Sequence, residues 1–198
     1  MLDLTEMFGE GWCVTLAPMG AMQALERMGV LKADLVRDGM ERASERLESG
    51  SEGPEVMLLA RDVRGGWCMV VELEGTSGWV GMDHGVLAAL SADGRVVVSA
   101  FQDPNQIMVQ VAADGTVVCE LDVLAGYFTR VWGEGRSVEL LLAAGYSRDG
   151  DPVGQAEQLD FAERAVLALA AVTGVELTEA DFDGPWLAGL AGPAGDPD

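Results

Sequence analysis

Apolar and alternating runs dominate the middle of the chain, from Trp67 to Leu121, and indicate a β-sheet. Val56–Ala60 is an apolar run, a glycine-containing turn follows, and Trp67–Leu73 is a second apolar run. Two such runs joined by a short turn are typical of a hairpin. We therefore predict that these two segments pair as antiparallel strands.

Three more strand patterns follow at short intervals. They cover Arg95–Phe101, Ile107–Val111 and Thr116–Leu121, with turn residues at 102–106 and at 113–115. Turns of this length favour an antiparallel meander. Together with the hairpin and the run Trp12–Leu16, the pattern predicts a mostly antiparallel sheet of about five or six strands.

Helical spacing of apolar residues predicts the elements that pack on this sheet. We expect helices after Pro18, at 31–47, at 138–144 and at 155–172, and a short turn starting at Thr178. In 31–47 the apolar residues form one face, although Gly39 is unfavourable inside a helix. We also expect a short helix from His84 to Leu90, with Asp83 as its N-cap.

This order of elements predicts an α+β fold in a single domain over residues 1–191. Residues 49–54 have the composition of a loop, and 192–198 are expected to be a disordered tail. The chain has 198 residues, a length typical of one domain with a substantial core.

The apolar runs and the N-terminal segment argue against a membrane-spanning or secreted protein. Apolar residues make up 49% of the chain, yet no run reaches the roughly 18 apolar residues of a membrane-spanning helix. The N-terminal segment 1–8 is acidic and lacks the basic start and apolar stretch of a signal peptide. We therefore expect a cytoplasmic protein with no membrane partner.

The formal net charge of −21 is the strongest feature of the composition. Nucleic-acid binding needs clustered Lys and Arg, so the charge argues against it. The acids are scattered, which is typical of a solubilising surface. They could also form an acidic face for a basic protein partner.

The three cysteines, Cys13, Cys68 and Cys119, are odd in number, and each lies in an apolar run. Free cysteine is among the residue types most often buried. We predict buried, reduced thiols, as expected in a reducing compartment.

Several segments together resemble an uncharacterised family of actinobacterial proteins that is catalogued as a domain of unknown function. The resemblance covers about residues 10–185 and is carried by Trp12–Leu16, Ala24–Gly29, Gly66–Glu72, Gly78–Gly81, Val86–Ser91, Arg95–Ser99 and Leu169–Thr178. Family members carry an aromatic residue and an asparagine where this chain has Phe101–Asn105, and Asn105 is the plain match. The resemblance implies a cytoplasmic α+β domain and supplies no activity.

Candidate chemistry centres on His84, the one histidine of the chain, beside Asp83. A neighbouring carboxylate can make a histidine an acid–base group, although a polar residue at a helix terminus is the commoner explanation. With one histidine and no C-x-x-C motif, the usual zinc sites are not expected. We predict no cofactor and no metal.

Paired carboxylates such as Glu72 and Glu74 share one face of a strand and could bind a cation or hydrolyse a glycoside. With 33 acidic residues such pairs arise by chance, so a solvated face is the favoured interpretation. Core positions are likewise favoured for the five tryptophans. Trp79, next to Gly78 and Gly81, and Trp132 are the two candidates for partial exposure and binding.

Three functional hypotheses remain. The first is a non-enzymatic interaction module that presents an acidic face around Trp79 and the 102–106 loop to a basic partner. It would act as an immunity-type inhibitor, by analogy with the small acidic bacterial proteins that neutralise toxins, or as a subunit of a small complex. Its candidate binding residues are Trp79, Asp83, His84, Phe101, Asp103, Asn105 and Trp132.

The second hypothesis is a hydrolase or metal-dependent enzyme using Asp83, His84 and nearby acids. The third is a small-molecule binder with a pocket between sheet and helices.

Overall fold

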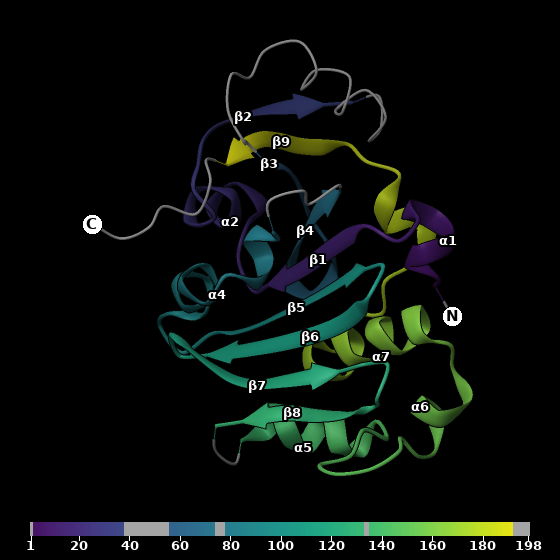
Figure 1. Ribbon diagram of the computed structural model, residues 1–198. Helices are drawn as coiled ribbons and strands as arrows, with labels where there is room; N and C mark the ends of the chain where they lie inside the picture. Colours follow the sequence, from purple (N-terminus) through teal and green to yellow (C-terminus); the bar gives the residue numbers. More distant parts are fainter. Residues whose placement is uncertain (1, 38–55, 74–77, 133–134, 192–198) are drawn as a thin grey trace.

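A computed structural model describes residues 2–37, 56–73, 78–132 and 135–191. Within these residues, nine strands form one fully antiparallel sheet in the order β2-β9-β3-β4-β1-β5-β6-β7-β8 (Figure 1). The predicted α+β fold with five or six strands is therefore wrong, because the protein is dominated by a single larger sheet. The strands are β1 Trp12–Ala17, β2 Val30–Val36, β3 Val56–Asp62, β4 Cys68–Leu73, β5 Val96–Asp103, β6 Gln106–Ala113, β7 Thr116–Asp122, β8 Tyr127–Val131 and β9 Trp186–Ala191.

Short helices cover parts of the sheet. The α-helices are α1 Leu4–Phe8, α2 Ala21–Arg27, α4 His84–Ser91, α5 Arg136–Ala143, α6 Gln155–Gln158 and α7 Phe161–Thr173, and 3-10 turns are η1 Arg64–Gly66, η2 Val80–Met82 and η3 Glu179–Phe182. The hairpin β3–β4, the meander β5–β6–β7, and the helix that begins at His84 are where the sequence predicted them.

Side-chain alternation along the strands produces two apolar cores. In β1, Trp12, Val14 and Leu16 face the core shared with α1, α5 and α7. Ala17, the last residue of β1, faces the other way and belongs to the core under α2 and α4. Because β1 lies in the middle of the sheet, all six of its residues are buried.

The helix predicted at 31–47 is wrong over its described part, where β2 runs from Val30 to Val36. Val30, Ala33 and Val36 are the more buried positions of β2, and their spacing of three mimics a helical stripe. Pairing with β9 decides the outcome, because it provides hydrogen-bond partners for the backbone groups of β2 that face β9. The remainder of that predicted helix, the predicted loop 49–54 and the predicted tail 192–198 lie outside the described residues.

The sequence patterns also missed β8 and β9. In β9 the central Gly189 weakened the strand signal. A Cβ at Gly189 would lie 2.2 Å from Val30 Cγ1, so glycine lets β2 approach β9 closely. In β8 only Phe128 is buried, so the apolar alternation is too short to recognise.

The helix predicted at 155–172 is divided. Asp160 is extended, accepts the Glu163 N–H at 2.8 Å, and forms a capping box that starts α7 afresh. Because this cap starts a new helix, α6 does not continue into α7, and the segment forms two separate helices. The prediction of one domain over residues 1–191 stays a prediction.

Candidate functional site

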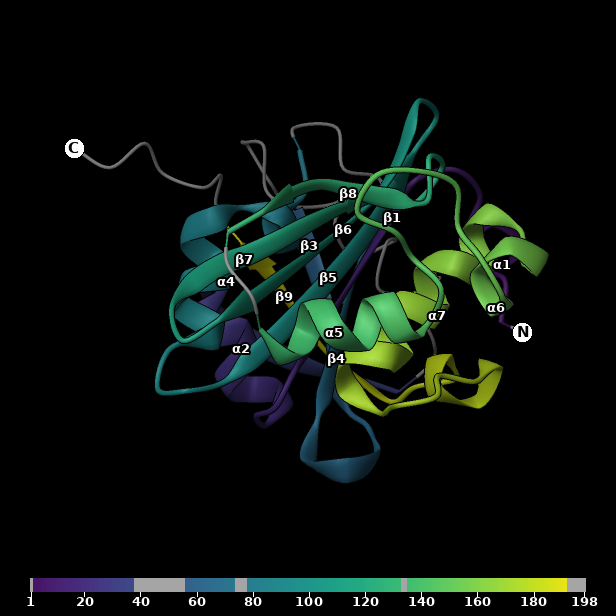
Figure 2. The same cartoon turned by 90° about the horizontal axis from the view of Figure 1, so that it is seen from below.

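The sheet surface over β5–β8 has helices on only one side for much of its area. Helices α5 and α7 lie behind these strands, and Figure 2 shows both on the same side of β6, β7 and β8 (Figures 1 and 2). On the other side, α4 packs against β5, β6 and β7, at the end of these strands that lies nearer to α2. We call the remainder of that side the open face. Its residues, by strand alternation, are Phe101, Asp103, Met108, Gln110, Glu120, Asp122, Tyr127 and Arg130, joined by Trp79, Met82, His84 and Trp132.

Trp79 and Phe101 form the aromatic pair at one end of the open face. Their ring centroids are 6.1 Å apart and the rings are tilted by 41°, a favourable geometry for aromatic contact. Trp79 is half-buried and Phe101 is buried. Trp79, one of the two tryptophans named as candidates for partial exposure, is half-buried rather than fully in the core, and the buried ring of Phe101 packs against it.

A buried carboxylate holds the Trp79 segment in place. Glu72 of β4 is 1% exposed, so the predicted solvated face is wrong for this residue. Its Oε2 accepts the Val80 N–H at 2.8 Å, and its Oε1 accepts the Gly81 N–H at 2.6 Å. Burial raises the pKa of Glu72 to about 7, although the Gly81 and Val80 hydrogen bonds favour the charged form. Glu74, its proposed pair, lies outside the described residues.

Gly81 fits directly onto the polar residues around Glu72. A Cβ at this position would lie 2.3 Å from Thr15 Oγ1 and 2.8 Å from Glu72 Oε1, so only glycine fits here. Thr15 and Ser99 share a hydrogen bond of 2.8 Å at the same place, and Cys13 Sγ lies 3.4 Å from Ser99 Oγ. Apart from Gly81 itself, no local sequence pattern indicates this cluster, because its side chains come from three strands.

His84 belongs to a second polar group, farther along the open face. Its Nε2 lies 3.3 Å from Glu120 Oε1 and 3.3 Å from Gln110 Nε2. Its ring meets Trp132 edge-on, with centroids 6.5 Å apart. Within the described residues, the polar contacts of His84 go to Glu120 and Gln110 and not to a hydroxyl or thiol nucleophile.

The neighbouring strand β8 adds a guanidinium to this group. Arg130 lies above the Trp132 ring at 5.9 Å, and its Nε is 3.6 Å from Glu120 Oε2. Trp132 is 47% exposed, so the core position favoured from sequence is wrong for it. Sequence reasoning missed Gln110, Glu120 and Arg130, because only strand register places them beside His84.

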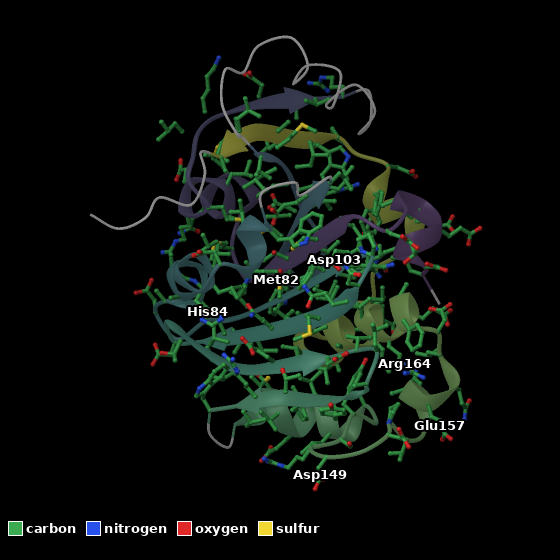
Figure 3. All side chains as sticks on the ribbon, in the orientation of Figure 1. Met82, His84, Asp103, Asp149, Glu157 and Arg164 are labelled. Atoms are coloured by element: carbon green, nitrogen blue, oxygen red, sulfur yellow. The ribbon has the colours of Figure 1, made fainter. Side chains whose placement is uncertain are left out.

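Asp83 performs a structural task. Its Oδ1 accepts the Val86 N–H at 3.0 Å and caps α4, as predicted. In Figure 3, Met82 and His84 lie near each other at the α4 side of the open face, and Asp103 lies toward the other end of β5. Asp83 and His84 are thus neighbours in the chain, but the carboxylate that contacts His84 is that of Glu120.

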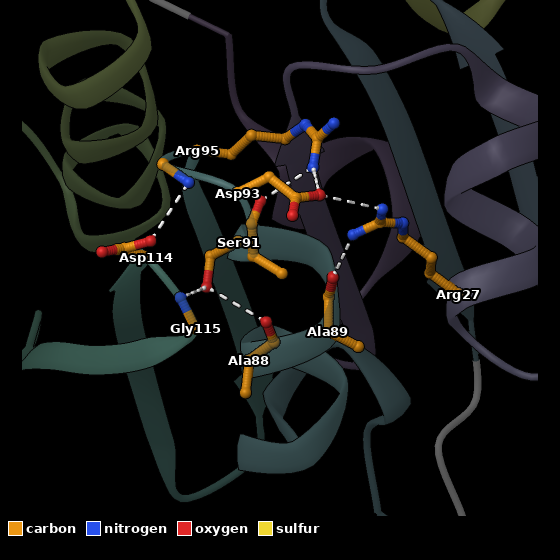
Figure 4. Close-up of polar contacts among 10 residues, drawn as sticks. Arg27, Ala88, Ala89, Ser91, Asp93, Arg95, Asp114 and Gly115 are labelled. Atoms are coloured by element: carbon orange, nitrogen blue, oxygen red, sulfur yellow. Dashed lines mark hydrogen bonds and ion pairs between the residues drawn. The ribbon is translucent and has the colours of Figure 1, made fainter.

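The other end of α4 is tied down by a polar network (Figure 4). Arg27 of α2 donates to the Ala89 carbonyl and reaches Asp93 Oδ2 at 3.5 Å, and Arg95 reaches the same oxygen at 2.8 Å. Arg95, followed by Arg27, lowers the pKa of Asp93. The Gly115 N–H donates to Ser91 Oγ at 3.1 Å, which attaches α4 to the β6–β7 turn. The network fixes the helix that carries His84.

Asp103 and Asn105 shape the β5–β6 turn. Asp103 Oδ1 accepts the N–H groups of Asn105 at 2.8 Å and Gln106 at 3.0 Å. Asn105 is exposed at the tip of the turn. Asp103 lies on the same side of β5 as Phe101, so the structure brings this turn to the edge of the open face.

A groove lies on the opposite side of the sheet, between α5, α7 and the segment after α7. Its volume is about 1040 Å³, and its lining includes Leu140, Ala144, Leu167, Ala171 and Leu177. Apolar side chains dominate this lining, as in many ligand sites. None of the seven residues predicted from sequence lines this groove.

The three cysteines are free and buried, as predicted. Burial raises the pKa of Cys68 and of Cys119 to about 12, and that of Cys13 well above its ordinary value. Such thiols are poor nucleophiles and poor metal ligands. Among the described residues, no group of three His, Cys, Asp or Glu side chains is arranged to hold a metal ion.

The fold and the site define a class: a large antiparallel sheet with helices packed on both sides, where α4 leaves part of one side over β5–β8 open as a polar, aromatic face. The chain belongs to the Family of unknown function (DUF6461), whose model matches residues 2–185. Comparison with curated proteins found no match, and comparison with solved structures found none either. Across the part of the chain that the structure describes, no helix combines the length and the apolar character needed to cross a bilayer.

Proposed function

We propose that the protein is a non-enzymatic interaction module whose open face binds a basic protein partner. The observation that carries this proposal is the open face itself, where exposed aromatic rings and carboxylates lie together. Trp132 and Tyr127 are exposed, and aromatic residues are the commonest anchors of protein interfaces. We propose that it acts in the cytoplasm of an actinobacterium, either as an immunity-type inhibitor or as a subunit of a small complex.

Charge supports a basic partner. Asp103, Glu120 and Asp122 bring carboxylates to the open face, and the whole chain carries a net charge of −21. A field of one sign accelerates encounter with a partner of the opposite sign and suppresses binding of acidic ones. Salt should weaken such an encounter, because it screens exposed charges.

The test uses two double variants that lose the same charge. Asp103→Asn with Asp122→Asn removes two charges from the open face while keeping oxygen acceptors for the turns that these residues cap. Glu139→Gln with Glu176→Gln removes two charges from exposed positions at α5 and after α7. Each protein is used for pull-down from native lysate at low and at screening salt, and partners are identified by mass spectrometry.

We expect one stoichiometric basic protein with the wild type and with the Glu139/Glu176 variant, and its loss with the Asp103/Asp122 variant and at high salt. The affinity of the purified pair is then measured by calorimetry for all three proteins. Equal affinity for all three, or an empty eluate, would contradict the proposal.

Two other candidates each have one favourable observation. The contact between His84 and Glu120 favours a hydrolase, which predicts that His84→Ala abolishes hydrolysis of some ester, phosphoester or glycoside in a substrate panel. The groove of about 1040 Å³ favours a small-molecule binder. That candidate predicts ligands that raise the melting temperature of the wild type but not of Ala171→Trp, which would fill the groove.

A further inference from the structure

A row of polar side chains runs from strand to strand, from the buried cluster beside Glu72 to the open face. The register pairs Thr15 with Ser99, Ser99 with Gln110, Gln110 with Glu120, and Glu120 with Arg130. Thr15 and Ser99 are fully buried, Gln110 and Glu120 are each 8% exposed, and the Arg130 side chain is 64% exposed. The row therefore opens to solvent at β8.

In the described part of the chain, two acceptor oxygens at the solvent end of this row lack a close hydrogen-bond donor, Gln110 Oε1 and Glu120 Oε2. Gln110 donates its Nε2 to Glu120 Oε1 at 3.0 Å, and its own Oε1 is buried without a hydrogen-bond partner among the described residues. A buried acceptor that lacks a partner is unfavourable, and native proteins contain few of them. Beside it, Glu120 is a nearly buried carboxylate whose Oε2 has only a long contact to Arg130. The site thus favours a ligand that donates hydrogen bonds and carries positive charge.

An aromatic wall completes this subsite. Trp132 is about half exposed and already has the guanidinium of Arg130 above its ring. A guanidinium stacks on an aromatic ring and donates in a planar fork, which a lysine ammonium does not do. The chemistry present is that of arginine recognition.

The chain's own arginine is held only weakly in this position. The 3.6 Å contact between Arg130 Nε and Glu120 Oε2 is longer than a strong charge-assisted hydrogen bond, and the side chain is largely exposed. Exposed ion pairs contribute little to stability. A second guanidinium could therefore replace Arg130 at low cost.

We propose that Gln110, Glu120 and Trp132 form a subsite for an arginine side chain of the basic partner, and that Arg130 occupies this subsite in the free protein. The inference rests on the proposed function, since it identifies the chemistry of the partner at the open face. Arg130 then acts as an internal competitor that moves aside when the partner binds.

The experiment uses the full-length chain labelled with nitrogen-15 and the peptide acetyl-Gly-Gly-Arg-Gly-Gly-amide. A second peptide carries citrulline, which has nearly the shape of arginine without its charge. The readout is the indole N–H signal of Trp132, assigned by comparison with Trp132→Phe. The arginine peptide should shift this signal, and the citrulline peptide should not.

The decisive variant is Arg130→Gln, which removes the competitor. Its matched control is Arg164→Gln, because Arg164 also lies above an aromatic ring, 5.2 Å from the centroid of Phe161, and its loss changes the net charge equally. We expect Arg130→Gln to raise affinity for the arginine peptide by up to about fivefold, the equivalent of one weak ion pair, with no comparable rise in the control. Glu120→Gln should abolish the shift.

Any of four results would overturn the subsite. They are an equal change of affinity in both variants, no change in either variant, weaker binding by Arg130→Gln, and a Trp132 signal that does not move. The two proposals can fail separately. A partner that is lost from the Asp103/Asp122 variant but unaffected by Trp132→Phe and Glu120→Gln leaves the proposed function standing without this subsite. A peptide that binds at Trp132 when no basic partner binds the open face leaves the subsite standing without that function.

Discussion

Glu72 is a buried acid whose neighbours are backbone N–H groups and small polar side chains. Those N–H groups belong to Val80 and Gly81, and Cys13, Thr15 and Ser99 pack around them. The carboxylate thereby fixes the backbone on both sides of Val80 and, through it, the position of the preceding Trp79. One residue therefore couples the interior of the sheet to the binding surface that we propose.

The raised pKa of Glu72 has a defined effect on stability. Because the folded pKa of about 7 exceeds the ordinary value of 4.5, the folded chain keeps a proton that the unfolded chain releases between these values. The Glu72 contribution is therefore fully present below about pH 4.5 and is lost as pH rises through about 7. The full loss is on the order of 3 kcal/mol, at 1.36 kcal/mol for each pH unit of difference.

This prediction is checked by urea unfolding of the wild type and of Glu72→Gln from pH 5 to pH 8. The free energy of unfolding of the wild type should fall relative to that of the variant over this range, since glutamine does not titrate. Other carboxylates affect both proteins alike and cancel in the difference. Two parallel curves would show that Glu72 does not titrate in this range.

At the scale of elements, α4 depends on contacts at both of its ends. Asp83 caps its first turn, and the network of Arg27, Asp93 and Arg95 holds its last turn. Since His84 is the first residue of this helix, its contact with Glu120 depends on the helix staying in register.

Replacement of Asp83 separates the hydrogen bond of the cap from the effect of its charge. Asp83→Ala should lower the free energy of unfolding by about 1 kcal/mol, because the Val86 N–H loses its acceptor. Asp83→Asn keeps a side-chain oxygen there and should cost much less. The measurement is chemical denaturation of the three proteins at one pH. Equal destabilisation by alanine and asparagine would mean that the charge of Asp83, rather than its cap, is what stabilises the helix.

The whole molecule carries a large excess of negative charge. With 33 acidic residues against 12 basic ones, repulsion between surface carboxylates opposes the compact state. Added salt shortens the range of that repulsion, to about 10 Å at 0.1 M.

We therefore expect the melting temperature to rise as sodium chloride increases from low concentration to about 0.5 M, with most of the rise in the lower part of the range. Differential scanning calorimetry measures it, and a charge-reversed variant of the exposed acids Glu139 and Glu176 should show a smaller rise. A melting temperature that falls with salt would indicate that attractive ion pairs, such as Arg64–Asp181, outweigh the repulsion.

Residue patterns along the chain predicted the elements whose signals are local. The hairpin β3–β4 and the meander β5–β6–β7 follow from alternation and turn residues, and the start of α4 follows from the Asp83 cap. Burial of the three cysteines follows from the apolar runs around them. Each of these depends on residues that are close together in the chain.

Features that depend on residues far apart in the chain became visible only in the folded protein. β2 forms a strand because β9 pairs with it, some 150 residues later in the chain, and Gly189 permits the approach. Glu72 is buried because η2 folds over it, and His84 meets Glu120 because α4 lies across β6 and β7. The physical reason is that sheet register and helix packing set which side chains meet, and neither can be determined from the spacing of residues along one strand or helix.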